Sequence, residues 1–320
     1  MDAAVRIVYL DQNKWIQLAR AVKFPSEAPD LAALLKAVTQ EVSAGRLVLP
    51  LTATNIYETH KINNAQKRHD LASIQAFLSG GHVFRARYKR LEVEVTEVLR
   101  GAYRLPLAHR EENYFLSNVF FEAFAERDDE RLGFHFSERA IEFIRSRPDF
   151  CLYEYLANIP EGVRITAVKK FSDGSDQLRQ RIEERRSRHA NESLPTRRRI
   201  HGAMLLLNEI DLVMKIAKKT EIPWQTVTDI GSSNARRIIN EVPTYFVERE
   251  IALRLEAENR PIEENDFRDM QSFCAVVPYA DAVIAENHFT NLAQQARLDK
   301  KYDTQISADI FALKGYLQAA

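Results

Sequence analysis

The sequence predicts an α/β protein whose parallel sheet is interrupted by a large, mainly α-helical insertion. Short apolar runs rich in β-branched residues lie at 5–10 (VRIVYL), 46–51 (RLVLPL) and 82–85 (HVFR). In the segments between them, apolar residues recur at the spacing of a helix. This alternation is typical of parallel strands joined by helical crossovers. It stops near Phe84 and resumes near Asp269.

The helices of the first part follow from their apolar spacing and their end signals. We expect a helix from Lys14 to Val22, one that ends at Ser43, and one over 63–78. Asp30 is a suitable N-cap for the second helix, and Gly45 a suitable stop.

Helical patterns dominate the middle of the chain. We therefore divide it into a first α/β part at 1–87, a helical insertion at 88–265, and a second α/β part at 266–320. The second part contains a buried strand at 282–285, a short strand at 303–307 and a closing helix at 308–317. The helices expected in the insertion cover 88–103, 114–124, 137–145, 175–190, 198–220, 232–240 and 245–258.

Composition excludes several classes of protein. The 320 residues carry 45 basic and 45 acidic side chains, so the net charge favours neither nucleic acid nor a membrane. No apolar stretch approaches the roughly 20 residues that span a bilayer. Cys151 and Cys274 lie far apart in apolar contexts, which predicts buried free thiols and a cytoplasmic location. Glycine-rich nucleotide loops and the common zinc motifs are missing from the sequence.

Acidic residues lie where strands end. Asp11 directly follows the first strand, and Glu286 follows the strand at 282–285. Glu58 falls in the first turns of the helix after the second strand, and Asp269 lies at the start of a helix. Ligands bind at the carboxyl ends of strands in open α/β sheets. The alternative is that these acids are solvated helix starts and turn residues.

These acids, in this order, resemble the pattern of the PIN-domain nucleases. The motif LDQN at 10–13 matches a first strand that ends in D-x-N, and Glu58 in TNIYE matches a glutamate after the second strand. Asp269 matches an aspartate that opens a later helix. Glu286 takes the last acidic position, where the family usually has aspartate. The turn PYAD is similar to that of a PIN-like subgroup, which makes Asp281 a fifth candidate. The resemblance covers roughly residues 1–87 and 266–320.

The resemblance implies a PIN-like three-layer fold and a nuclease that depends on one or two Mg²⁺ or Mn²⁺ ions. Asp11 would bridge the ions, Glu58, Asp269 and Glu286 would complete their shells, and Asp281 would add to them. Two such ions about 3.5–4 Å apart activate water and neutralise charge during phosphodiester hydrolysis. Asn13 would orient Asp11 or the scissile phosphate, or else cap the first helix.

RNA is the more expected substrate, in a toxin or defence role. The alternatives are a flap-processing nuclease that acts on DNA and a non-catalytic scaffold that binds RNA or protein. A regulator protein or a second copy of the chain would be a further partner, and no membrane is expected.

A basic segment is the candidate for substrate binding. Residues 164–201 contain eleven Arg and Lys against five Asp and Glu, and Arg197, Arg198 and Arg199 follow Pro195 as a triplet. Phosphate contact is one interpretation. The other is a solvated helix with Glu–Arg pairs.

Overall fold

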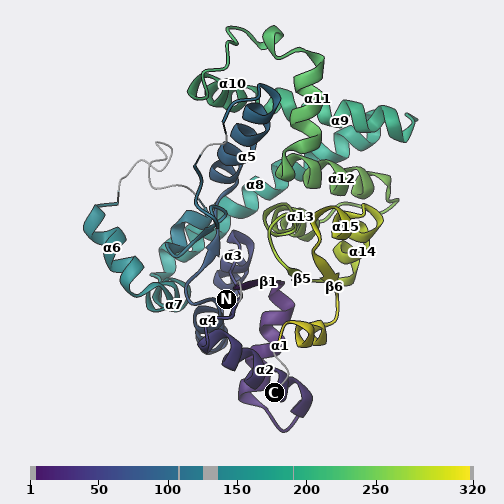
Figure 1. Cartoon of the computed structure of the whole chain (residues 1–320). Coiled ribbons are helices and arrows are strands. Elements are labelled where there is room, and N and C mark those ends of the chain that lie inside the picture. Colours follow the sequence, from purple (N-terminus) through teal and green to yellow (C-terminus); the bar gives the residue numbers. More distant parts are fainter. Residues whose placement is uncertain (1–4, 107–108, 125–135, 190, 318–320) are drawn as a thin grey trace.

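The structure is a computed structural model that describes residues 5–106, 109–124, 136–189 and 191–317, and it is an α/β protein dominated by helices (Figure 1). Val8 pairs with Ala282, and Leu10 pairs with Ile284. The predicted parallel sheet is confirmed. Its four strands run in the order β2 (Leu47–Val48), β1 (Arg6–Leu10), β5 (Ala282–Ile284) and β6 (Gln305–Ser307).

Beyond β2 the chain meets a two-stranded sheet. The amide of Phe84 donates to the carbonyl of Leu51 (2.8 Å), three residues after β2. This bond places β3 (Val83–Phe84) parallel to the chain at Leu51. β4 (Leu116–Ser117) pairs with β3 in the antiparallel direction. The predicted helix at 114–124 is therefore wrong, because the described chain there forms β4 and then a four-residue 3-10 helix, and a two-residue strand has no periodicity to mark it.

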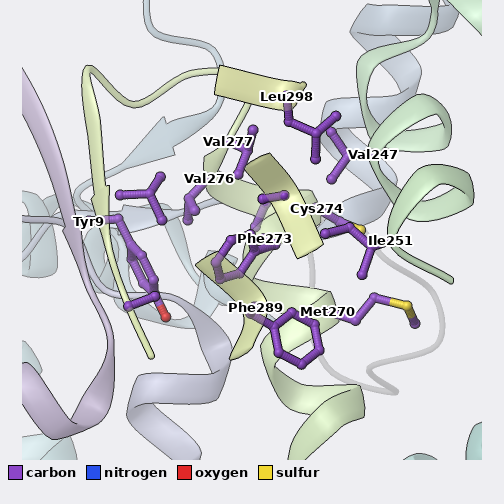
Figure 2. Close-up of a cluster of buried hydrophobic side chains, with 14 of the residues drawn as sticks. Tyr9, Val247, Ile251, Met270, Phe273, Cys274, Val276, Val277, Phe289 and Leu298 are labelled. Atoms are coloured by element: carbon purple, nitrogen blue, oxygen red, sulfur yellow. The ribbon is translucent and has the colours of Figure 1, made fainter. Parts of the chain in front are cut away.

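Both faces of the sheet are covered. Because side chains alternate along a strand, Ile7 and Tyr9 of β1 enter one core, and Val8 and Leu10 enter the other. Figure 2 shows part of the first core, in which Phe273 and Phe289 lie together with Tyr9. The helices that supply this core are chiefly α12 (Pro243–Ala257), α13 (Glu264–Val276) and α14 (Asn287–Gln295).

The second core lies under helices from both ends of the chain and from its middle. Trp15, Leu18 and Ile56 are fully buried in it. The elements around it are α1 (Gln12–Lys23), α2 (Pro29–Ser43), α3 (Ala53–Lys61), α4 (Ala65–Ser79), α7 (Pro148–Asn158) and the 3-10 helix η4 (Ile310–Tyr316).

A third core is formed mainly by helices, together with loop residues such as Trp224. Leu99, Ile216, Trp224 and Ile238 are among its buried members. Its helices gather at the top of Figure 1, away from the sheet. They are α5 (Arg87–Ala102), α9 (Leu194–Asn208), α10 (Ile210–Lys219) and α11 (Gly231–Glu241).

The predicted insertion is thus mainly helical, but only part of it lies apart from the sheet, because α7 and α12 contribute to the two sheet cores. No helix in the described part of the chain is long and apolar enough to cross a membrane. The remaining elements are η1 (Phe120–Ala123), α6 (Glu138–Ser146), α8 (Glu161–Arg188), η3 (Val227–Ile230) and α15 (Leu298–Tyr302).

Gly81 fixes the approach of α4 to α7. It has φ +76°, and a Cβ atom there would lie 2.3 Å from the backbone carbonyl carbon of Pro148. No larger residue fits without a backbone shift. We predict that Gly81→Ala lowers the free energy of unfolding by about 2–4 kcal/mol, because it adds overpacking to the strain of a left-handed conformation.

Gly45→Ala is the matched control in the same denaturant experiment. Gly45 has φ +69°, but a Cβ atom added there would meet nothing within 4 Å, so the variant should lose only about 1 kcal/mol. Equal losses at the two glycines would contradict the packing role of Gly81.

Candidate functional site

The strand order reverses at β1. The chain runs from β1 to β2 on one side and returns later through β5 on the other. Such a reversal leaves a crevice at the carboxyl ends of the strands. Asp11 directly follows β1, and its amide donates to the carbonyl of Ile284 at the end of β5 (2.9 Å). Glu286 follows two residues after Ile284. Because neighbouring strands are about 4.8 Å apart, the two acids reach the same crevice.

Two helices bring the other predicted acids to this place. α3 carries Glu58, and α13 carries Asp269. Thr54 Oγ1 donates to the carbonyl of Arg268 (3.4 Å), which ties the start of α3 to α13. The four acids open into one cleft of about 370 Å³, hereafter the acidic cleft. Its lining residues are Asp11, Gln12, Asn13, Glu58, Lys61, Ile62, Asn265, Arg268, Asp269 and Glu286.

Burial and mutual repulsion raise the pKa values of three of these carboxyl groups. Loss of solvation is the largest cause for each. The pKa of Asp11 rises to about 6, with Glu286 adding repulsion. The pKa of Glu58 rises to about 7 and that of Asp269 to about 9, and in both the charge of Asp11 is the next cause. The acids therefore interact electrostatically, and their repulsion favours binding of a cation or a proton in the cluster.

Nearby cations offset this repulsion only in part. Arg268 and Lys61 both lower the pKa of Glu58, and Lys14 lowers that of Asp11, yet both pKa values stay raised. The acidic cleft thus keeps an unbalanced negative charge when its carboxyl groups ionise.

The donor set fits Mg²⁺ or Mn²⁺ in kind, since both ions prefer carboxylate oxygen. Within the described ranges, no group of three or more His, Cys, Asp or Glu side chains is arranged as it stands to hold a metal ion. The four carboxylates are thus gathered in one cleft but not preassembled as a coordination shell.

Asn13 also lies in the acidic cleft. Its side-chain amide donates to Oε1 of Glu286, which joins the residues that follow β1 and β5. The N-cap of α1 is Asp11, and Asn13 lies within the helix, so the predicted alternative of Asn13 as a cap is wrong.

The inclusion of Asp281 among the metal ligands is a prediction that the structure contradicts. Asp281 precedes β5, and its Oδ2 accepts from the amide of Ile7 at the start of β1 (2.6 Å). β1 and β5 are parallel, so this is the amino end of the sheet, opposite to Asp11. Asp281 ties the two strands together there.

The arginine triplet does not line the acidic cleft as the structure describes it. Arg198 forms a two-pronged ion pair with Glu250 of α12 (3.1 and 3.0 Å), and Arg197 lies 3.6 Å from Glu256. Arg199 is exposed and donates to Thr196. Arg197 and Arg198 thus help to hold α9 against α12, although the side chain of Arg198 is still 40% exposed.

A ring of buried side chains supports the acidic cleft from behind, and sequence reasoning missed it. Gln12 donates to Thr59 (2.9 Å), Thr59 to Gln75 (2.8 Å), and Gln75 back to Gln12 (3.1 Å). The three residues come from α1, α3 and α4, so the ring fixes these helices around Asp11. Gln12 within LDQN was the available signal, but its partners are distant in sequence. Lys61 and Arg268 of the cleft wall were also missed, since nothing in their spacing marks them.

A larger cavity of about 560 Å³ lies elsewhere, between the start of α3, the start of α5 and the middle of α13. The two acids of its described lining, Glu209 and Glu248, both pair with Arg87. The cavity gathers no cluster of acids, so we place the functional site in the acidic cleft.

Comparison with known proteins gives no relative: no family model, no curated protein and no solved structure matches this chain.

The raised pKa values predict how stability depends on pH without metal. Folded carboxyl groups with raised pKa values hold protons more tightly than unfolded ones, so stability is lost as pH rises from about 4 through the folded pKa values. In EDTA at pH 8, the free energy of unfolding of Asp269→Asn should therefore exceed that of wild type by about 1 kcal/mol. This gain is somewhat less than the free energy that corresponds to a shift of one pKa unit. The gain should shrink at pH 5.

Thermal or urea unfolding at the two pH values measures this gain. Asp281→Asn, at the other end of the sheet, is the control and should keep the wild-type pH profile. If Asp269→Asn follows the wild-type profile too, burial and repulsion do not raise the pKa of Asp269 in the folded state.

Proposed function

We propose that this chain is a divalent-metal-dependent nuclease of the PIN-like type, which hydrolyses phosphodiester bonds of RNA. The observation that carries the proposal is the convergence of Asp11, Glu58, Asp269 and Glu286 at the carboxyl ends of β1 and β5. Raised carboxyl pKa values and the hard oxygen donors support a divalent cation in the acidic cleft.

The residues of the acidic cleft have separable tasks. Asp11 and Glu286 would hold the cation from the ends of two buried strands, and Glu58 and Asp269 would hold it from two helices. Asn13 donates to Glu286 and so orients that carboxylate. A divalent ion bound here supplies an activated water and neutralises charge on the phosphate. The hydrogen-bonded ring of Gln12, Thr59 and Gln75 keeps the supporting helices in place.

The preference for RNA follows from the resemblance to PIN-domain nucleases. Two other functions are outcomes of the same assay: cleavage of DNA alone would indicate a DNA-directed nuclease, and absence of metal binding would indicate a scaffold. Matched RNA and DNA oligonucleotides with Mg²⁺, Mn²⁺ or EDTA distinguish them.

We predict that Asp11→Asn lowers cleavage of RNA by more than about a hundredfold, because residues that merely support metal ligands already contribute about 10–100-fold. The substitution keeps the size of the side chain and removes the charge that a metal requires. Initial rates with saturating Mn²⁺ measure the effect.

Asp281→Asn is the matched control, because Asp281 is an acid of the same sheet whose side chain accepts only a backbone hydrogen bond in the described structure. Asparagine retains an acceptor oxygen, so cleavage should stay at the wild-type rate. A wild-type rate for Asp11→Asn would rule out the proposed mechanism.

A further inference from the structure

Arg268 is a buried cation in the wall of the acidic cleft, next to Asp269 in sequence. It is 4% exposed. Its Nε is buried and has no hydrogen-bond partner among the described residues. A buried arginine with an unsatisfied donor at the edge of a cleft calls for an acceptor that enters the cleft.

Aromatic packing holds this guanidinium in place. Its central carbon lies 5.4 Å from the ring centre of Tyr57, and Lys61 Nζ lies 5.7 Å from the same ring. Both distances are within the range of cation–π attraction. Phe171 of α8 stacks on Tyr57 at 4.2 Å. The ring of Tyr57 thus positions both cations of the cleft wall.

The carboxylates around Arg268 do not satisfy it. Glu58 Oε1 and Glu264 Oε1 are each 3.7 Å from the guanidinium, beyond the usual range of about 2.7–2.9 Å for a charge-assisted hydrogen bond. The same oxygen of Glu264 already accepts from Tyr57 and Ser172. By contrast, the guanidinium of Arg260 donates two hydrogen bonds to the carboxylate of Asp266 nearby, at 2.8 and 2.6 Å. An arginine whose task is to neutralise an acid would form such a pair.

A bound cation in the acidic cleft would reverse the local electrostatics. Glu58 would then engage the cation and leave Arg268 still less satisfied. The group that suits a carboxylate-bound cation on one side and a guanidinium on the other is an anion with several acceptor oxygens. Phosphate has this chemistry, and Arg is well matched to it.

We propose that Arg268, steadied by Tyr57, is the residue that contacts the phosphate of the substrate in the acidic cleft. The inference rests on the proposed function and deepens it, since it assigns recognition of the phosphate to a residue outside the four acids. Lys61, on the same ring, adds positive charge beside it. The arginine triplet of α9 is not needed for this contact.

Isothermal titration at pH 7.5 tests the assignment with Mg²⁺ alone and with inorganic phosphate at saturating Mg²⁺. We expect Arg268→Gln to bind Mg²⁺ as tightly as wild type or more tightly, because a neighbouring cation is gone. Its affinity for phosphate should fall about tenfold or more, the usual effect of losing a charge-assisted hydrogen bond. Without Mg²⁺, neither protein should bind phosphate.

Arg90→Gln is the control for loss of a buried arginine. Arg90 is 3% exposed and lies outside the acidic cleft, where it donates to the carbonyls of Arg85 and Cys274. It should keep wild-type affinity for Mg²⁺ and phosphate. If Arg268→Gln does not fold, Arg268→Lys decides, since it retains the charge and loses the forked donors, and it should show a smaller but measurable loss.

The outcomes separate the two proposals. Equal phosphate affinity in the Arg268 variants and wild type, with Mg²⁺ bound, overturns the role of Arg268 and leaves the metal-dependent function standing; a water molecule would then satisfy Nε. Absence of both Mg²⁺ and Mn²⁺ binding in wild type overturns both.

Discussion

Repulsion among four carboxylates at the carboxyl end of the sheet is the constraint on which this structure depends. Burial raises the pKa values of Asp11, Glu58 and Asp269, and the charge of Asp11 raises those of the other two further. Ionised carboxylates in such a cluster lower the stability of the folded state, so packing elsewhere must compensate for them. The fold gathers the acids by ending two neighbouring buried strands at one crevice, and the helices packed on both faces supply that compensation.

The residues around the acidic cleft fix the positions of its carboxyl groups more than they neutralise their charge. The buried ring of Gln12, Thr59 and Gln75 is closed. Each of the three side chains donates one hydrogen bond to the next and accepts one from the previous. Arg268, the one buried guanidinium of the described cleft wall, stays at 3.7 Å from the nearest acids. Close ion pairs form instead outside the cleft lining, as between Arg260 and Asp266 and between Arg198 and Glu250.

The sequence allowed the sheet and its acids to be predicted because both depend on local signals. A buried strand followed by an acid places Asp11 and Glu286, once the strands are parallel. The same rule excludes Asp281, since an acid that precedes a parallel strand lies at the opposite edge of the sheet. β4 is too short for any periodicity.

Other features depend on contacts between distant segments and were beyond local signals. The partners of Arg197 and Arg198 lie far along the chain on α12, so a basic triplet resembled a free surface. Apolar spacing predicted most of α12 but missed α7, and spacing alone does not show which core a helix packs into; both helices pack against the sheet. Arg268 becomes meaningful only when Tyr57 and the acids surround it.

The central claim is that the four acids form one metal site, and anomalous diffraction from crystals soaked in Mn²⁺ tests it most directly. The account predicts one or two manganese peaks between Asp11 and Glu286, within coordination distance of carboxylate oxygens from Glu58 or Asp269 as well. Peaks confined to surface carboxylates, with the acidic cleft free of manganese at a saturating concentration, would contradict it.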